Sequence, residues 1–195
     1  MKSRIEALNL IDSSILSKKQ ALEVGLNSYD LSELINEGVL EREGRGVYRK
    51  IGKRMPENES YAMALAHLGS PSVICLWSAL VFHDLTDEAP SEIWVYLPLE
   101  KYSHIKGLVV VRKKNPQWDV GIEEHDGIRV TNIERTLVDA LADGRHFDEF
   151  TPFRMVLSAI RNKKTTEAKL LEMAKKLGVE KRVGKKLLYL QDTYV

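Results

Sequence analysis

The stretch SKKQALEVGLNSYDLSELINEGVLEREGRGVYR, residues 17–49, decides the fold of the first part of this 195-residue chain. Ser17 is a good N-cap for a short helix, because its hydroxyl can accept a bond from a free amide of the first turn. Asn27 opens a second helix, and Gly38 stands where the left-handed residue after a helix is needed. The apolar face of the second helix consists of Leu31, Leu34 and Ile35.

A glycine-rich turn follows the second helix. Val39-Leu40 and Val47-Tyr48 are strand signals on either side of Glu43-Gly44-Arg45-Gly46. Residues 1–11 add a first helix with Ile5, Leu8 and Ile11 on one face. Two helices joined by a tight turn and followed by a β-wing form a DNA-reading geometry. The sequence therefore predicts a winged helix-turn-helix over residues 1–54.

The rest of the chain predicts an α+β middle region and a helical C-terminal region, so the fold class is α+β. A linker is expected over residues 50–58, and one domain over 59–195, whose basic helical tail covers 151–195. Further elements are expected as a helix at 59–67, a strand or loop at 73–76 leading into a helix, strands at 92–97 and 108–112, a hairpin at 121–130, a helix at 132–141, and helices capped by Thr151 and by Thr165 or Thr166.

Composition narrows the class of protein. The hydrophobic content of 44% is enough for a core, and no apolar run approaches the ~20 residues that a membrane helix needs. The single cysteine, Cys75, excludes a disulfide framework and a thiol metal cluster. These features predict a cytoplasmic protein with no metal site, no cofactor and no membrane partner.

The net charge of +1 hides a strong asymmetry along the chain. Residues 1–54 carry a net +2, residues 55–150 a net −8 and residues 151–195 a net +7. A basic tail suggests a polyanion or an acidic partner at one end of the protein. The alternative is that these cations form the solvated face of ordinary helices.

The second helix is unusually acidic for a DNA reader. It carries Asp30, Glu33 and Glu37 and no lysine or arginine, and carboxylates oppose the phosphate backbone unless they point away from it. Cations would then come from the preceding helix and from the wing. The candidate DNA-binding residues are Lys18, Lys19, Asn27, Ser28, Tyr29, Ser32, Arg42, Arg45 and Arg49. The alternative is a winged helix that serves as a protein–protein module.

Basic residues of the tail form a second candidate surface. Arg182, Lys185 and Lys186 fall on one helical side by their spacing, and the surface would meet a toxin, RNA or DNA backbone. Its candidate residues are Arg161, Lys163, Lys164, Lys181, Arg182, Lys185 and Lys186. Catalysis is not expected, because Arg135 and Asp139 are four residues apart on one helix and are explained as a local ion pair.

Several segments together resemble the AbiEi-type antitoxins, the transcriptional regulators of type IV toxin–antitoxin systems. The resemblance covers nearly the whole chain, and it is carried by short motifs that occur in the family's order. These are Arg45-Gly46-Val47-Tyr48, Trp77-Ser78-Ala79-Leu80 with His83-Asp84-Leu85 (Asp84 replacing the usual glycine), Gly121-Ile122-Glu123, Gly127-Ile128-Arg129-Val130-Thr131, Glu134-Arg135-Thr136-Leu137-Val138-Asp139-Ala140-Leu141, and the tail from Lys169-Leu170 to Tyr189-Leu190.

The resemblance implies a protein with two roles. The winged helix would bind operator DNA at inverted repeats and repress the antitoxin–toxin operon, while the C-terminal part would counteract a nucleotidyltransferase-like toxin, without requiring a stable complex. Such systems are associated with phage defence by abortive infection. Two other hypotheses stay open, namely an interaction protein or regulator of other genes without operator binding or toxin partner, and a weaker one of an enzyme that uses Glu134 or Asp139.

Overall fold

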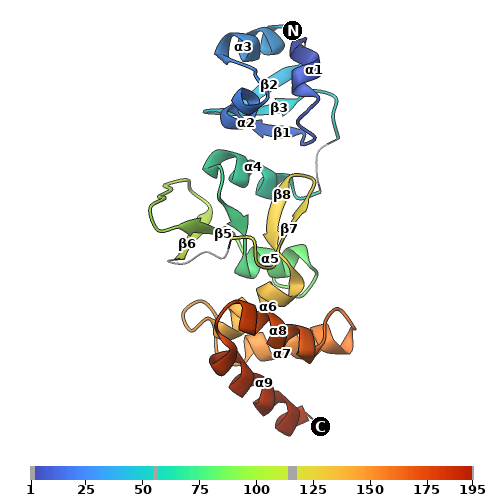
Figure 1. Ribbon diagram of the computed structural model, residues 1–195, viewed down its shortest axis with the longest axis vertical. Helices are drawn as coiled ribbons and strands as arrows, with labels where there is room; N and C mark the ends of the chain where they lie inside the picture. Colours follow the sequence, from blue (N-terminus) through green and yellow to red (C-terminus); the bar gives the residue numbers. More distant parts are fainter. Residues whose placement is uncertain (1–2, 55–56, 114–117, 195) are drawn as a thin grey trace. The chain divides into compact units, whose positions relative to one another are not determined.

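The computed structural model describes residues 3–54, 57–113 and 118–194 (Figure 1). The chain divides into two compact units. Unit 1 consists of residues 1–72 with 124–128, and unit 2 of residues 73–123 with 129–195. The mixture of helices and sheets confirms the predicted α+β class.

Unit 1 contains four helices and a three-stranded antiparallel sheet among its described residues (Figure 1). The sheet has the order β1-β3-β2, so the first strand pairs with the last strand of the hairpin. The elements are α1 (Arg4–Leu8), β1 (Ile15–Ser17), α2 (Lys18–Glu23), α3 (Ser28–Asn36), β2 (Leu40–Gly44), β3 (Val47–Lys50) and α4 (Glu59–Leu68). This order of helices, strand and hairpin is compatible with a winged helix.

The caps of α2 and α3 confirm the helix starts predicted from the sequence. The Ser17 side chain accepts a hydrogen bond from the Gln20 amide, and the Gln20 side chain accepts one from the Ser17 amide. Asn27 and Asp30 form the same reciprocal capping box at the start of α3. Gly38 has a φ of 70° directly after α3, as predicted for a helix C-terminus.

The structure of unit 1 differs from the sequence analysis in three places. Strand β1 was not predicted, because three residues are too short to show alternation. Helix α1 ends at Leu8 rather than near residue 11, and Ile5 is half exposed instead of facing the core. Lys50 was assigned to the linker, but it is the buried last residue of β3.

The core of unit 1 joins α1, α2 and α3 to the sheet. Its buried members are Ala7, Leu8, Ile11, Leu16, Ala21, Leu26, Leu31, Leu34, Leu40 and Tyr48. Helix α4 contacts β1 and β3 and is part of this unit, which differs from the predicted division into 1–54 and 59–195. The reason is that α4 packs on the small sheet, although the intervening segment is rich in polar residues.

Unit 2 contains most of a five-stranded mixed sheet with the order β6-β5-β4-β8-β7. Strands β5 and β6 are parallel, β4 is antiparallel to β5, and β4 pairs in parallel with β8 through Ile74 and Val130. The strands are β4 (Val73–Ile74), β5 (Ile93–Pro98), β6 (Leu108–Lys113), β7 (Ile122–His125) and β8 (Ile128–Thr131). The predicted hairpin is confirmed, with Asp126 and Gly127 at positive φ in its turn.

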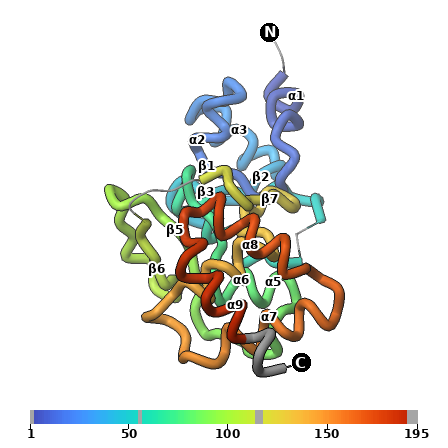
Figure 2. The backbone as a smooth tube through the Cα atoms, turned by 60° about the horizontal axis from the view of Figure 1, so that its bottom comes forward, coloured from blue at the N-terminus to red at the C-terminus, as the bar shows by residue number. Residues whose placement is uncertain are grey.

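Helix α6 is the centre of the helical part of unit 2. It contacts α5, α7, α8 and α9, and Figure 2 shows these helices around it. Its neighbours are α5 (Leu76–Phe82), α7 (Thr151–Arg161), α8 (Glu167–Lys176) and α9 (Glu180–Tyr194), with α6 itself at Ile133–Ala142. The core between them includes Leu80, Leu137, Val138, Leu141, Val156, Leu170, Ala174, Val183 and Leu187.

The helix caps of unit 2 agree with the sequence at two of three positions. Asn132 caps α6 and Thr166 caps α8, each accepting a bond from the amide three residues later. Thr151 does not cap α7 but is its first residue, because the Asp148 carboxylate accepts the amide hydrogens of both Phe150 and Thr151. None of the described helices is long and apolar enough to cross a membrane.

Candidate nucleic-acid interface

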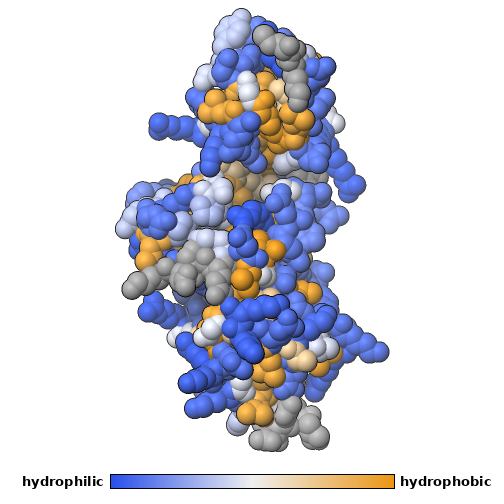
Figure 3. All heavy atoms as spheres, viewed as in Figure 1, coloured by the Kyte–Doolittle hydropathy of each residue, from blue (hydrophilic) through white to orange (hydrophobic). Residues whose placement is uncertain are grey.

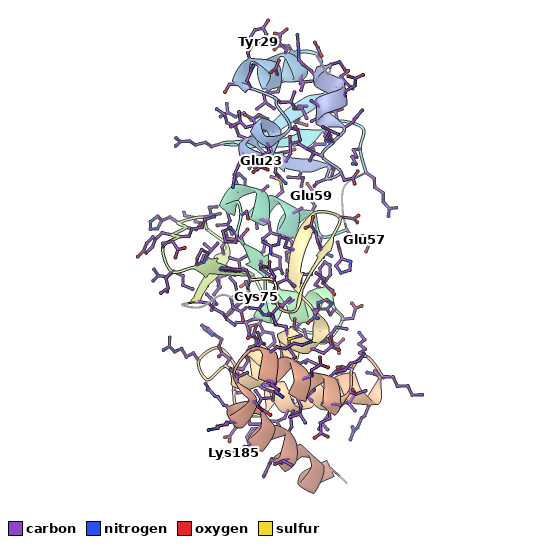
Figure 4. All side chains as sticks on the ribbon, in the orientation of Figure 1. Glu23, Tyr29, Glu57, Glu59, Cys75 and Lys185 are labelled. Carbon is purple, nitrogen blue, oxygen red and sulfur yellow. The ribbon has the colours of Figure 1, made fainter. Side chains whose placement is uncertain are left out.

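Part of the exposed surface of α3 is polar and uncharged. Tyr29 is 66% exposed (Figure 4). Ser28, Ser32 and Asn36 are also exposed. The Ser32 hydroxyl donates to the Ser28 carbonyl oxygen at 3.0 Å, which leaves its lone pairs for a further donor. Asn27 differs from these residues, because its side chain is already engaged: its Oδ1 caps α3 by accepting hydrogen bonds from the amides of Tyr29 and Asp30.

Three carboxylates, those of Asp30 and Glu33 on α3 and of its C-cap residue Glu37, gather on one guanidinium from α1. Arg4 Nε lies 3.6 Å from Asp30, and Arg4 Nη1 lies 3.6 Å from Glu33 and 3.2 Å from Glu37. The positions 30, 33 and 37 share one flank of the helix. The acidic residues that argued against DNA binding are therefore held on the α1 side of α3.

The arginines of the wing differ in their availability. Arg49 is bound to the carboxylates of Glu41 and Glu43, and the hydrogen bond to Glu43 raises the pKa of its guanidinium. Arg42 Nε donates to the Gly44 carbonyl oxygen at 3.3 Å. Arg45 is therefore exposed at the turn itself, whereas Arg49 is occupied by two carboxylates.

The start of α2 lies beside the wing. The Lys18 amide donates to the Gly46 carbonyl oxygen at 2.7 Å, so Lys18 and Arg45 belong to adjacent segments. The Lys18 side chain is exposed, whereas Lys19 lies 3.8 Å from Glu23 on the same helix. Together, the exposed Lys18 and Arg45 provide a small cationic site next to the wing.

Two residues of this interface were missed in the sequence. Asn36 lies four residues after Ser32 and shares its exposed face, a spacing that was visible in the sequence. Arg4 is far from α3 in the chain, and its role depends on how α1 packs against α3. The sequence indicated only that Arg4 lies near the start of the first predicted helix.

The second candidate surface, in unit 2, is smaller than the sequence suggested. Lys164 Nζ donates to the carbonyl oxygens of His83 at 2.8 Å and Asp84 at 2.7 Å. Lys186 Nζ donates to the Leu141 carbonyl oxygen at 2.6 Å, near the end of α6. These two lysines therefore have structural partners within the unit.

The other predicted cations of this surface are exposed. They are Arg161, Lys163, Lys181, Arg182 and Lys185. Lys181, Arg182 and Lys185 lie on α9. The same helix carries Leu188 and Tyr189, which are 60% and 61% exposed. Figure 3 shows hydrophilic side chains with interspersed hydrophobic ones over the helical part of unit 2.

A cluster of charged and phenolic side chains in unit 2 joins the buried Tyr96 and Arg135 to the partly buried Lys113 and Asp139. Asp139 accepts hydrogen bonds from Lys113 Nζ at 2.7 Å, Tyr96 Oη at 3.1 Å and Arg135 Nε at 3.3 Å. Burial raises the pKa of Tyr96 well above its ordinary value, and the adjacent Asp139 carboxylate raises it further. The predicted pair of Arg135 and Asp139 is present, but Arg135 is only 2% exposed and the pair is part of a larger network.

This cluster joins α6 to strands β5 and β6 of the sheet. Arg135 also donates to the Val120 carbonyl oxygen, and every buried side-chain polar atom of the described residues has a partner. Cys75 is fully buried, and burial raises the pKa of its thiol well above the ordinary value. Among the described residues, no group of three or more His, Cys, Asp or Glu side chains is arranged to hold a metal ion.

Comparison with known proteins identifies the N-terminal segment. Residues 3–49 match the family of AbiEi antitoxin transcriptional regulators. This match confirms the resemblance for α1 through β3, the part of unit 1 that holds Arg4, α3 and the wing. The resembling motifs after residue 70 lie outside the matched residues.

Among solved structures, the chain is similar to the crystal structure of the RV2827C protein from Mycobacterium tuberculosis. The two share 14% sequence identity over 88% of this chain and 70% of that chain, with a TM-score of 0.48. No curated protein matches the chain.

Proposed function

We propose that this chain is an antitoxin and a DNA-binding autorepressor of a type IV toxin–antitoxin operon. The observation that carries the proposal is the coincidence of the AbiEi match over residues 3–49 with the helix, strand, two-helix and hairpin order of unit 1. In this proposal unit 1 is a winged helix-turn-helix. Its α3 contacts base edges and its wing contacts phosphates.

Unit 2 is proposed to counteract a nucleotidyltransferase-like toxin without any catalysis of its own. The exposed cations Arg161, Lys163, Lys181, Arg182 and Lys185 supply a surface for an acidic partner. The buried network around Asp139 supports this surface from within the unit by fixing α6, which α8 and α9 contact. The proposed role in phage defence follows from the operon type and depends on the toxin.

The repressor half is tested by binding to the DNA upstream of the chain's own gene. Affinity is measured for this DNA and for a scrambled duplex of the same length and composition, over a series of salt concentrations. A specific complex that weakens steeply with salt is expected. Equal affinity for both duplexes at every salt concentration would contradict the proposal and favour an interaction protein without operator binding.

The antitoxin half is tested by co-expression with the neighbouring toxin gene in a growth assay. The full chain is expected to restore growth, and replacement of Lys181, Arg182 and Lys185 together by glutamine is expected to weaken the rescue. A charge-matched control replaces Lys169, Lys175 and Lys176, which are also exposed but lie on α8. Loss of rescue in the control alone would contradict the assignment of this surface.

A further inference from the structure

We propose that Arg4 is the positioning residue that allows the acidic helix α3 to read DNA. It gathers the three carboxylates of α3 on one flank, so that the uncharged face with Tyr29, Ser32 and Asn36 can enter the major groove. The inference rests on the proposed DNA binding of unit 1 and adds a residue outside the helix-turn-helix to it.

The first step of the argument is the convergence of the contacts. Asp30, Glu33 and Glu37 all lie within 3.6 Å of the same guanidinium, at i, i+3 and i+7. Their side chains are 20%, 32% and 49% exposed, so the flank is accessible to solvent but occupied by Arg4. One planar cation with five donors can bind several carboxylates at once, which an ammonium does less well.

The second step is the placement of Arg4. It is the first residue of α1, and a capping box fixes the start of that helix. The Glu6 amide donates to the Ser3 hydroxyl at 3.1 Å, and the Ser3 amide donates to the Glu6 carboxylate at 2.7 Å. Leu8 then packs in the core that α1 shares with α3. The capping box and the packing of Leu8 therefore hold the backbone of Arg4 in place relative to α3.

The third step is the chemistry of the free face. Without Arg4, three negative charges would face a duplex that carries one charge per ~1.7 Å of axis. With Arg4 bound, one charge is cancelled and the carboxylates are turned to the α1 side. The exposed uncharged groups of α3 are the hydroxyls of Ser28, Tyr29 and Ser32 and the Asn36 amide, and Tyr29 borders the Arg4 flank, since Arg4 Cζ lies 6.0 Å from the centroid of its ring. An asparagine amide can pair with adenine through two bonds, and hydroxyls bond to base edges or phosphates.

The experiment uses the full chain and a duplex that the wild-type protein enriches from a random library. Arg4→Gln is expected to weaken binding about tenfold at moderate salt, because unbalanced carboxylates then repel the phosphates. Glu33→Gln with Glu37→Gln is expected to bind as tightly as wild type or more tightly. Addition of Arg4→Gln to that double variant is expected to change the affinity by less than about twofold.

Arg4→Lys and the salt dependence provide the independent readouts. Arg4→Lys keeps the charge but gathers several carboxylates less well, so it is expected to restore only part of the affinity. When Arg4→Gln is added to the Glu33→Gln and Glu37→Gln variant, the slope of log affinity against log salt is expected to change by less than about 0.3, because Arg4 does not neutralise a phosphate. Lys53→Gln, which removes an exposed cation elsewhere in unit 1, is the matched control and is expected to have less than a twofold effect.

Two results would overturn the inference while leaving DNA binding intact. The first is wild-type affinity in Arg4→Gln. The second is a tenfold loss that persists when Glu33 and Glu37 are neutralised and that lowers the salt slope by about 0.9, which would make Arg4 a direct phosphate contact. Failure to enrich any duplex would instead overturn the proposed DNA binding itself, and the inference with it.

Discussion

Lys113 Nζ lies 2.7 Å from a carboxylate oxygen of Asp139, which connects the end of β6 to the middle of α6. The Lys113 ammonium also lies 3.9 Å from the centroid of the Tyr96 ring. A charge at the end of an apolar strand is thus balanced inside the unit. The packing of the sheet against the central helix α6 of unit 2 therefore depends on the Asp139 carboxylate.

Asp139→Asn is expected to destabilise unit 2 by about 2–4 kcal/mol, because it leaves the Lys113 and Arg135 cations without their buried counter-charge. Chemical unfolding followed by tryptophan fluorescence measures this change. Glu172→Gln breaks the exposed pair with Lys176 and is expected to cause no measurable change. Similar stability losses in both variants would contradict a buried network.

Lys50→Met is expected to destabilise unit 1 by about 1–3 kcal/mol. The buried Lys50 ammonium donates to the carbonyl oxygens of Leu8 and Ile11, which methionine would leave without a donor. Lys53→Met, at an exposed position nearby, is the control and should leave the unfolding midpoint of unit 1 unchanged. A Lys50→Met protein as stable as wild type would show that water satisfies those carbonyls.

Asp143 is expected to contribute to the loss of stability in acid. Burial raises its pKa, but hydrogen bonds from the His146 ring and from the amides of His146 and Arg145 outweigh burial and bring the pKa below the ordinary 3.8. The stabilisation is therefore complete above 3.8 and is lost as the pH falls through the lower pKa of the folded state. Unfolding of wild type and Asp143→Asn is compared from about pH 6 to about pH 2.

The difference in stability between wild type and Asp143→Asn should be greatest at the upper end of that pH range and should shrink toward the lower end. Glu149→Gln removes an exposed carboxylate from the same connection and is the control. A stability difference that does not change with pH would mean that the carboxylate charge does not matter.

Gly121→Ala is expected to destabilise unit 2 by about 2–4 kcal/mol. Gly121 has a φ of 63°, and an added Cβ would lie 2.8 Å from Arg135 Cβ and 2.9 Å from Met173 Cε. Gly178 has a φ of 70° but faces open space, so Gly178→Ala isolates the backbone strain, about 1 kcal/mol. Thermal unfolding of both variants measures the steric part as a difference, and equal losses would argue against crowding at Gly121.

The wing arginines are expected to act unequally on DNA. Arg45→Ala should weaken binding to every duplex and lower the salt slope by about 1, since its exposed cation is free to neutralise a phosphate. Arg49→Gln should have a smaller effect, because Glu41 and Glu43 already bind that guanidinium. A larger effect of Arg49→Gln on affinity would show that the wing rearranges on DNA.

Local signals in the sequence were sufficient for the elements that depend on local chemistry. Ser17 and Asn27 identify their helices because a cap bonds to amides two or three residues away. Gly38 and Asp126-Gly127 identify turns because a positive φ is also a local property of the residue. The division into units was harder, because the contacts of α4 with β1 and β3 join residues distant in the chain.

The sites show the same limit. The sequence supplied the exposed candidates Tyr29 and Arg45, since exposure of a polar helix face or turn follows from local pattern. It could not show that Arg4 binds the α3 carboxylates, or that Asp139 joins the buried Arg135 to the buried Tyr96. Those facts depend on the packing of whole helices, which no spacing in the chain reveals.

The pairing of the strands also sets an order for folding during synthesis. All strands of the β1-β3-β2 sheet lie between Ile15 and Lys50, so the ribosome has delivered the entire sheet early. In unit 2, β4 pairs with β5, which follows it closely in the chain, and also with β8, which is translated much later, so the β4–β8 pairing closes a long loop. The small N-terminal sheet can therefore form before the pairing of β4 with β8 is possible.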